Sequence, residues 1–542
     1  MPPRKSTRSK TRQRVNEERV EPAAVEQVAE KPTEEDSDAK TMVQYIVERL
    51  EMATTPQRFV QVMGLLFIIN LFYLYNIDDA DAKENLITVG LTLLGLLTQV
   101  AVIFNHQFKQ YSAQLLTDEP DTAQEPQFPD FDMIYAVLLP LLVCLVTKPS
   151  YLPFVVGSVC QVTGMADLPK LLIAVAAEYQ AAGIEDRRLA QFLAAPVLHL
   201  LISKGFGFYA GSSLSNAEKQ MFSTLLVSLV FGVDSYSQIT MVILQKLSIA
   251  LVGCLVLYTP VYKMYLAQPG HARTGLLTLL YLSFSSTFFF ASVYQLKGAL
   301  GQHPLTWLNL FFQQGDRLRI LGAWLISLVL LVPLVFRLSP SWALDTRRKV
   351  WHFTIVAILT YPLVSDPFFV SLALIGVIGL FVLIELLRAL RLPPLGPFIA
   401  DSLDKFRDER DKNGPLVISY IFLLLGIALP LFWSGNASTE AAVSGLISVG
   451  LGDASASLVG TRFGRHHWWD SKKSAEGTIA FVIVSTLTLA AFDKVAGIDY
   501  SVPDIAVACV IAAGLEAVSD INDNIVVPTV MFITLSTLKS RT

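Results

Sequence analysis

Apolar runs long enough to cross a lipid bilayer recur from residue 57 onward, and this pattern constrains the fold more than any other feature. A transmembrane helix needs about 20 apolar residues. Runs that meet or approach this length are 57–76, 86–104, 131–147, 240–260, 275–294, 320–336, 368–387 and 416–433. Shorter runs are 151–163, 188–203, 221–233, 350–364, 441–451, 477–492, 505–519 and 525–538. The pattern predicts an all-α polytopic membrane protein with roughly 15 transmembrane helices.

The composition agrees with a chain that is dissolved mainly in lipid. Of its 542 residues, 53% are hydrophobic and 16% are charged, whereas about 25% are charged in a soluble domain. The formal net charge is −4, so the chain as a whole does not attract a polyanion. We therefore expect the lipid bilayer as a partner and no nucleic acid.

Three regions differ in character along the chain. Residues 1–40 are rich in charge and lack aromatic residues, which predicts a disordered tail. Residues 41–340 are a multi-pass membrane scaffold in which we find no constellation of chemical groups. Residues 341–542 interleave apolar runs with polar clusters, and this pattern predicts a multi-pass catalytic region.

The polar clusters of the last region are expected on one side of the membrane. Counting successive crossings from "DTRRKVWH" (345–352) places the polar segments 388–414 and 452–477 on the same side. Segment 388–414 is rich in arginine and lysine, whereas the intervening "SGNASTE" (434–440) has no basic residue and contains a glycosylation sequon at Asn436. Because basic loops stay in the cytosol, we expect one cytosol-facing polar site built from C-terminal loops, among them 388–414 and 452–477.

The stretch "GDASASLVGTRFGRHHWWDSKKSAEG" (452–477) has the charges and small residues of a nucleotide-phosphate site. Small residues let backbone N–H groups approach phosphate, and Lys472 and Lys473 neutralise phosphate charge. Asp453 is the acid of the glycine-rich part and a candidate Mg²⁺ ligand. The alternative is that the small residues serve helix packing and that the lysine pair anchors lipid headgroups.

A second acidic cluster is "LEAVSDINDN" (515–524). If its helix continues through the cluster, Glu516, Asp520 and Asp523 at spacing i, i+4 and i+7 share one face. Carboxylates at a membrane helix end are unfavourable unless they are paired or bind a cation. Asp453, Asp523 and Glu516 are therefore the expected metal ligands.

Two further clusters add charge of both signs. In "DKFRDERD" (404–411), Asp404, Asp408 and Asp411 repeat the i, i+4, i+7 spacing and alternate with Arg407 and Arg410; the alternative is a solvated loop. "RRKVWH" (347–352) contributes Arg347, Arg348, Lys349 and His352. His352 is either a proton carrier or phosphate ligand, or an ordinary histidine at a helix end.

Neither a P-loop, nor a G-x-G-x-x-G fingerprint, nor a protein-kinase H-R-D set occurs in the sequence, so a different nucleotide cradle is required. The segments "GDASASLVGTRFGRHHW", "SKKSAEGT", "FRDERDKNGPLVISYIFLLLGIALPLF" and "DNIVVPT" resemble the CTP-dependent polyprenol kinases, and among them the dolichol kinases. The resemblance is specific over about 345–530 and only architectural before it.

This resemblance implies CTP as donor, a divalent cation such as Mg²⁺, dolichol as acceptor, dolichyl phosphate for protein glycosylation as product, and the endoplasmic reticulum membrane as location. The Asp-Asn element of the family matches Asp523 and Asn524. The resemblance also places the nucleotide on the stretch 452–477, with these residues: Gly452, Ser455, Ser457, Gly460, Gly464, Lys472, Lys473, Glu476 and Gly477.

The expected reaction is in-line transfer of a phosphoryl group to an alcohol at the membrane surface. Asp453 is the first choice to accept the hydroxyl proton and Asp408 the second, and the sequence does not separate base from metal ligand. Alternatives are a phytol, farnesol or diacylglycerol kinase, a phosphatidate cytidylyltransferase or, from another class, a transporter. A transporter predicts inverted repeats around charges at the membrane midplane, and the sequence contains no such repeat.

Overall fold

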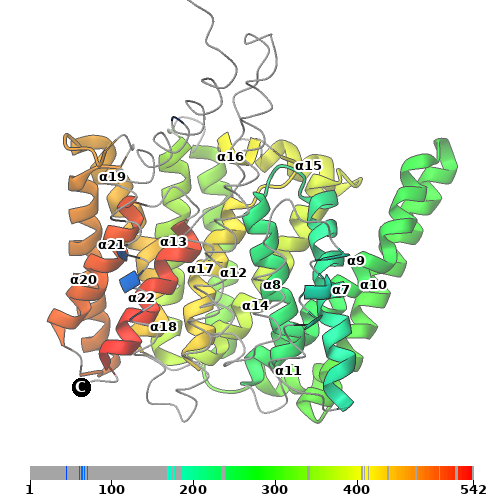
Figure 1. Ribbon diagram of the computed structural model, residues 1–542, viewed down its shortest axis with the longest axis horizontal. Helices are drawn as coiled ribbons and strands as arrows, with labels where there is room; N and C mark the ends of the chain where they lie inside the picture. The colour runs from blue at the N-terminus through cyan, green and yellow to red at the C-terminus, as the bar shows by residue number, and fades with distance from the viewer. Residues whose placement is uncertain are drawn as a thin grey trace, which may run out of the picture. The chain divides into compact units, whose positions relative to one another are not determined.

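A computed structural model describes residues 186–233, 238–338, 344–403, 409–412, 414–435, 439–469, 473–499, 501–518 and 523–539, with Trp342, Arg407 and scattered positions between 44 and 176. Over these residues the chain is helical, and the extended contact in them is one isolated bridge between His467 and Ser474. Figure 1 shows the helices, coloured by their order in the chain.

The helices fall into two groups along the chain. The first group is α7 (Asp186–Tyr209), α8 (Asn216–Gly232), α9 (Ile239–Ala267), α10 (Gly270–Leu300), α11 (Pro304–Phe312) and α12 (Arg317–Leu338). The second group is α13 (Leu344–Ser365), α14 (Pro367–Ala389), α15 (Leu395–Leu403), α16 (Glu409–Lys412), α17 (Ser419–Trp433), α18 (Glu440–Ile447), the π-helix η4 (Ser448–Gly452), α19 (Asp453–Phe463), α20 (Ala475–Ala496), α21 (Val502–Val518) and α22 (Asp523–Lys539).

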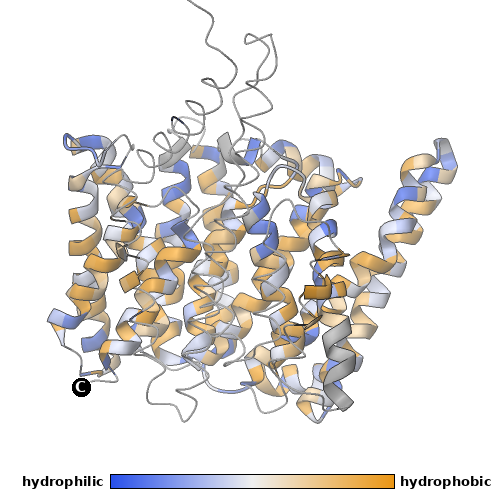
Figure 2. Cartoon of the chain, in the orientation of Figure 1, coloured by the Kyte–Doolittle hydropathy of each residue, from blue (hydrophilic) through white to orange (hydrophobic). Residues whose placement is uncertain are grey.

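Each apolar run that we expected from residue 188 onward is helical, apart from a residue or a few at some ends. The run 441–451 is divided between α18 and η4. Six segments of the described chain are long and apolar enough to cross a membrane: 239–267, 270–300, 317–335, 367–389, 440–463 and 475–496. Figure 2 shows the apolar residues along the helices. The chain is therefore an all-helical, multi-pass membrane protein. The apolar runs before residue 168 lie almost entirely outside the described residues.

Local sequence signals set where several helices begin and end. The side chain of Asp366 accepts a hydrogen bond from the Phe369 backbone N–H, and Pro367 occupies the first position of α14. Ser474 caps α20 in the same way, by accepting from the Gly477 backbone N–H. Gly497 ends α20 in the left-handed conformation that glycine adopts without steric cost.

The main core lies among α17, α18, α20, α21 and α22. Nearly every residue of α22 from Asn524 to Thr537 is buried, so this helix is surrounded by others. In contrast, α10 and α12 bury little of their apolar length. Such exposed apolar faces are what a lipid-facing helix presents.

The segment 452–477, which we expected to be a loop, is largely helical. The span Glu440–Phe463 runs through α18, η4 and α19, and the connection to α20 begins only at Gly464. Close packing explains this, because a Cβ atom at Gly445 would lie 2.2 Å from the Gly426 carbonyl oxygen and one at Gly452 would lie 2.7 Å from the Phe481 ring. Small residues in this stretch let α18 and α19 approach their neighbours.

Candidate active site

A π-helical turn places the first candidate catalytic group. η4 comprises Ser448–Gly452, and Asp453 follows it directly as the first residue of α19. π-turns inside α-helices are rare and frequently occur at functional sites. A Cβ atom at Gly450 would lie 2.4 Å from the Val356 side chain, so glycine lets η4 approach α13.

Asp453 faces two side chains that are neighbours on α13. Lys349 Nζ donates a hydrogen bond to Asp453 Oδ2 over 2.6 Å. His352 Nδ1 lies 3.5 Å from the same oxygen. Lys349 and His352 are buried, while the Asp453 side chain is 21% exposed. The i, i+3 spacing on α13 therefore brings an ammonium and an imidazole to one carboxylate, a pairing that the sequence did not indicate.

The surroundings of His352 fix which nitrogen carries the proton of its neutral form. Nδ1 lies 2.9 Å from the backbone carbonyl oxygen of Val449 in η4. A carbonyl oxygen can only accept, so Nδ1 is the donor and Nε2 of the neutral ring is left as an acceptor. The Val449 carbonyl is a contact that sequence reasoning missed, because no residue type announces it.

A second ion-paired group forms around Lys473. Its Nζ lies 2.8 Å from Glu516 Oε1 and 3.5 Å from Asp523 Oδ2, and it also donates to the Glu516 backbone carbonyl. Burial lowers the pKa of the Lys473 ammonium, but the charges of Asp523 and Glu516 outweigh burial, so the pKa is raised above its usual value. Lys473 is therefore charged at neutral pH.

The shared helical face that we expected for Glu516, Asp520 and Asp523 is wrong. α21 ends at Val518 and α22 begins at Asp523, so Glu516 and Asp523 belong to different helices. They come together because Lys473 lies against both of them. Asp520 lies outside the described residues.

The two ion-paired groups adjoin each other. Asp453 interacts electrostatically with Lys473, and Glu516 interacts with Asp453. Five charged side chains of the described chain thus form one cluster: Lys349, Asp453, Lys473, Glu516 and Asp523. We call them, with His352, the Asp453 cluster. Its three carboxylates outnumber its two ammonium groups.

The glycine-rich stretch packs helices within the described structure. Cβ atoms at Gly460 and Gly464 would lie 3.0 and 2.8 Å from Ser474 Oγ, and one at Gly477 would lie 2.8 Å from the Ala456 carbonyl oxygen. Ser455 Oγ donates to the Gly452 carbonyl. Ser457 likewise lies on α19, and its carbonyl accepts from Thr461. A phosphate-binding role for these residues stays a prediction.

Glu476 holds the connection between α19 and α20. Its Oε1 lies 2.8 Å from His466 Nδ1, and both carboxylate oxygens lie 3.3 Å from the His466 backbone N–H. The backbone N–H of Trp468 donates to the Lys473 carbonyl in the same connection. This arrangement places Lys473 beside α21 and α22.

The "FRDERD" cluster organises its own segment. Asp411 accepts from the Ile418 backbone N–H and the Ser419 hydroxyl, and so holds the segment to the start of α17. Arg407 donates to the carbonyls of Asp411 and Gly414. These contacts support the alternative of a structural segment for both residues, while a role in the polar site stays a prediction.

A buried group that we did not single out anchors the same segment. Glu385 and Arg388 on α14 are 2% and 4% exposed, and they form a bidentate ion pair. Glu385 also accepts from the Val417 N–H and the Tyr420 hydroxyl. The signal in the sequence was an acid inside an apolar run.

Other expected site residues either lie outside the Asp453 cluster or are not described by the structure. Arg347 donates to the Trp342 carbonyl, and Arg348 lies beside it on α13. Asn524 is buried next to Asp523 at the start of α22. Outside the described residues, or with undescribed side chains, lie Asp408, Lys472, Asp404, Arg410 and Asn436.

The donor set can be tested for its fit to a divalent cation. No group of three His, Cys, Asp or Glu side chains that could hold a metal ion is present in the described part of the chain. Mg²⁺ does not need three protein ligands, because one or two carboxylates, the phosphate oxygens of a substrate and water complete its coordination shell. The excess of carboxylate in the Asp453 cluster fits such a cation, since a nucleotide phosphate would otherwise meet net negative charge.

The fold and the cluster define a multi-pass helical membrane protein with an acidic and basic site beside a π-turn. A family model described as "Dolichol kinase N-terminal domain" matches residues 16–234. This match precedes the Asp453 cluster in the chain. No solved structure matches the chain.

Relatives named dolichol kinases match most of the chain. The chain is 32% identical to the dolichol kinase of Saccharomyces cerevisiae, across 75% of this chain and 77% of that protein. It is 32% identical to dolichol kinase sec59 of Schizosaccharomyces pombe, across 62% and 71%. It is 30% identical to the dolichol kinase of Homo sapiens, across 43% and 48%. The chain belongs to the dolichol kinase family.

Proposed function

We propose that this chain phosphorylates the terminal hydroxyl of dolichol, with CTP as donor, at the Asp453 cluster. The relatives over most of its length are named dolichol kinases, which supports the acceptor. The single observation that carries the site is the ion-paired carboxylate of Asp453 between Lys349 and His352, next to Lys473. Phosphoryl transfer needs such positioned charges more than covalent chemistry.

The proposed step balances as an in-line displacement. The dolichol oxygen forms a bond to the γ-phosphorus of CTP while the bond between that phosphorus and the β–γ bridging oxygen breaks, and CDP leaves. The hydroxyl proton passes to the carboxylate of Asp453. Lys349 keeps that carboxylate in place. The Val449 carbonyl holds Nδ1 of His352, so Nε2 of the neutral ring is free to accept a proton.

The residues around Lys473 are proposed to neutralise the phosphate charge of CTP. Lys473 and its neighbour Lys472 are proposed to contact the phosphates of CTP, and Asp523 and Glu516 to hold Mg²⁺ together with those phosphates. When bound, the cation neutralises developing charge on the phosphate oxygens and orients them. Glu476 and the glycine-rich part of α19 support the connection on which Lys473 lies.

We further propose the endoplasmic reticulum membrane as location, roughly 15 crossings and a cytosol-facing site. Basic segment 388–414 and the connection 464–474 would then be labelled from the same side. Single cysteines at the exposed positions Asp401 and His467, in sealed microsomes, test this with a membrane-impermeant maleimide. Labelling of one position only from the cytosol and the other only from the lumen would contradict a single site.

The activity is tested with the purified full-length chain. CTP, ATP, GTP and UTP are compared as donors with dolichol, phytol, farnesol and diacylglycerol as acceptors. The proposal predicts the highest kcat/KM for CTP with dolichol. A higher kcat/KM for another acceptor identifies a different lipid kinase, and a cytidine-diphosphate lipid as product identifies a cytidylyltransferase.

A further inference from the structure

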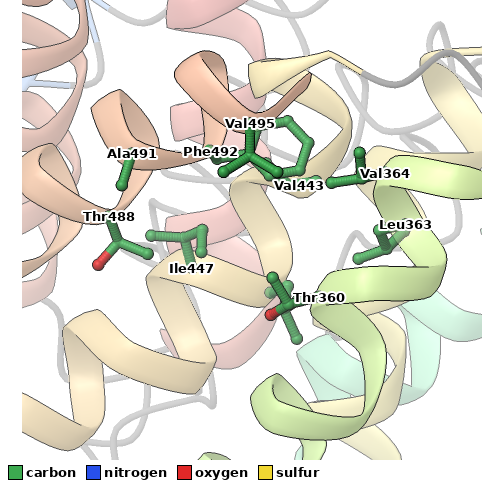
Figure 3. A pocket seen from close by; sticks show the side chains of 10 residues that line it. Thr360, Leu363, Val364, Val443, Ile447, Thr488, Ala491, Phe492 and Val495 are labelled. Carbon is green, nitrogen blue, oxygen red and sulfur yellow. The ribbon is translucent and has the colours of Figure 1, made fainter. Parts of the chain in front are cut away.

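An apolar cavity opens along the same helices that carry the Asp453 cluster. Its volume is about 160 Å³. Figure 3 shows its lining side chains, which come from α13, α18 and α20. α18 packs against both α13 and α20 and forms the back of the cavity. The lining residues are Thr360, Leu363, Val364, Val443, Leu446, Ile447, Thr488, Ala491, Phe492 and Val495.

The cavity offers no group that would recognise a polar ligand. Its two polar side chains, Thr360 and Thr488, donate their hydroxyl hydrogens to the carbonyls of Val356 and Val484 in their own helices. The remaining lining atoms belong to aliphatic and aromatic side chains. An unbranched or branched hydrocarbon is therefore the chemical class that this cavity accepts.

The cavity opens toward the side of the molecule that lipid would cover. Val495 is 75% exposed, and Ala491 and Thr360 at the lining are also exposed. Both 440–463 and 475–496, which carry lining residues, are apolar enough to cross a membrane. A hydrocarbon chain can thus enter from the bilayer between α13 and α20 without crossing water.

The position of the cavity relative to Asp453 follows from helix geometry. Ile447 ends α18 and precedes Asp453 by six residues, with η4 between them. The α-helical rise of 1.5 Å per residue limits their separation along the axis to about 9 Å. Thr360 follows His352 by eight residues on α13, or about 12 Å. An alcohol with its oxygen at Asp453 would reach the cavity with roughly two isoprene units, each adding four bonds of about 1.5 Å.

We propose that this cavity, between α13, α18 and α20, binds the isoprene units of the polyprenol that follow the first two from the hydroxyl, and so positions its alcohol at Asp453. This inference rests on the proposed function. Lipid tails are as apolar as the cavity wall, so the cavity supplies little net hydrophobic energy to a substrate that is already in the bilayer. Its contribution is placement of the reacting oxygen, which is worth orders of magnitude in rate.

The test narrows the cavity and compares acceptors of different length. Ala491→Phe places a ring at the cavity, and Leu487→Phe, 66% exposed on the same helix and absent from the lining, is the matched control. For Ala491→Phe we expect kcat/KM for dolichol to fall about ten- to a hundredfold. We expect kcat/KM for a two-unit isoprenoid alcohol and KM for CTP to stay within about twofold in the same variant.

Each outcome separates the inference from the function on which it rests. No dolichol phosphorylation by the wild-type chain would remove the proposed function itself. Wild-type activity with an unchanged dolichol kcat/KM in Ala491→Phe, or an equal loss in Leu487→Phe, would overturn the cavity assignment and leave the function standing.

A second measurement does not depend on the folding of any variant. A dolichol analogue with a diazirine in its third isoprene unit is photolysed with the wild-type chain, and the labelled peptides are mapped. We expect labels in 360–364, 443–447 and 488–495, the segments that line the cavity, with competition by dolichol. Labels confined to peptides from other helices would overturn the proposal.

Discussion

Lys349 Nζ lies 2.6 Å from Asp453 Oδ2, although 104 residues separate the two in the chain. Lys349 is on α13, and Asp453 follows a π-turn that glycine allows to approach α13. This ion pair therefore shows that two polar motifs far apart in the sequence, 347–352 and 452–477, form one site.

The stability of this pair can be measured apart from its role in activity. Lys349→Met leaves the Asp453 carboxylate without its ammonium partner, and breaking a largely buried pair costs about 3–5 kcal/mol. We expect a lower Tm for Lys349→Met and a substantial recovery of Tm in Lys349→Met/Asp453→Asn. Activity should be lost in both variants. Equal Tm values for wild type and Lys349→Met would contradict the pairing.

Lys473 is predicted to contact the phosphates of CTP. Removing one charge-assisted contact should cost about 1.5–3 kcal/mol, so Lys473→Ala should raise KM for CTP roughly ten- to a hundredfold. Steady-state kinetics with varied CTP measures this. Lys494→Ala, an exposed lysine at the other end of α20, is the control and should leave KM unchanged. Unaltered CTP kinetics in Lys473→Ala would reject the assignment.

The pH dependence of stability provides a second test of Lys473. Its folded-state pKa is raised by Asp523 and Glu516, so its contribution is fully present below the unfolded lysine pKa of about 10.4. The contribution is lost as pH rises through the folded pKa. The Tm difference between wild type and Lys473→Met should therefore be constant from about pH 6 to 9 and shrink above about pH 10.4. A difference that vanished between pH 6 and 8 would show a lysine that is neutral there.

Asp523 is predicted to help hold a divalent cation. Asp523→Asn removes a charge that faces Lys473 and should shift the Mg²⁺ dependence of dolichol phosphorylation to higher concentration. Asp504→Asn is the control, because Asp504 lies in the first turn of α21, at the end of that helix away from Glu516. Chelation of divalent cations should abolish turnover of the wild-type chain, and Mg²⁺ should restore it. A superimposable Mg²⁺ curve for Asp523→Asn would transfer the role to another carboxylate.

Gly452 tests whether close packing sets the position of Asp453. A Cβ atom there would lie 2.7 Å from the Phe481 ring and from Ser485 Oγ, so Gly452→Ala should cost about 1–3 kcal/mol of stability and reduce kcat. Gly376→Ala in α14, where a Cβ atom would have no neighbour within 4 Å, should be neutral or stabilising. Equal stability of both variants would contradict the packing argument.

Hydropathy predicted the helices because each crossing must satisfy its own backbone groups in lipid. It failed at 452–463, where polar and glycine residues resemble a loop but are needed for contacts of α19 with α20. The i, i+4, i+7 spacing failed for Glu516 and Asp523, because α21 ends at Val518 and α22 begins at Asp523, so the two carboxylates lie on different helices. Spacing alone does not show where a helix stops.

The residue types of the Asp453 cluster were visible in the sequence, and their pairing was not. Lys349 and His352 share a helix face by spacing, but their choice of Asp453 as partner depends on the π-turn. Lys473 was expected at phosphate and lies between two carboxylates. Such long-range partners follow from tertiary packing, which residue spacing does not encode.

The most direct test of the central claim is transfer of the γ-phosphoryl group from labelled CTP to dolichol by the purified full-length chain and by Asp453→Asn. Asparagine keeps the size of the side chain and removes its charge and basicity. We predict labelled dolichyl phosphate from the wild-type chain and a kcat lower by about 10²–10⁴ in Asp453→Asn, with CTP still bound. Wild-type kcat in Asp453→Asn, or no labelled dolichyl phosphate from the wild-type chain, would contradict the account.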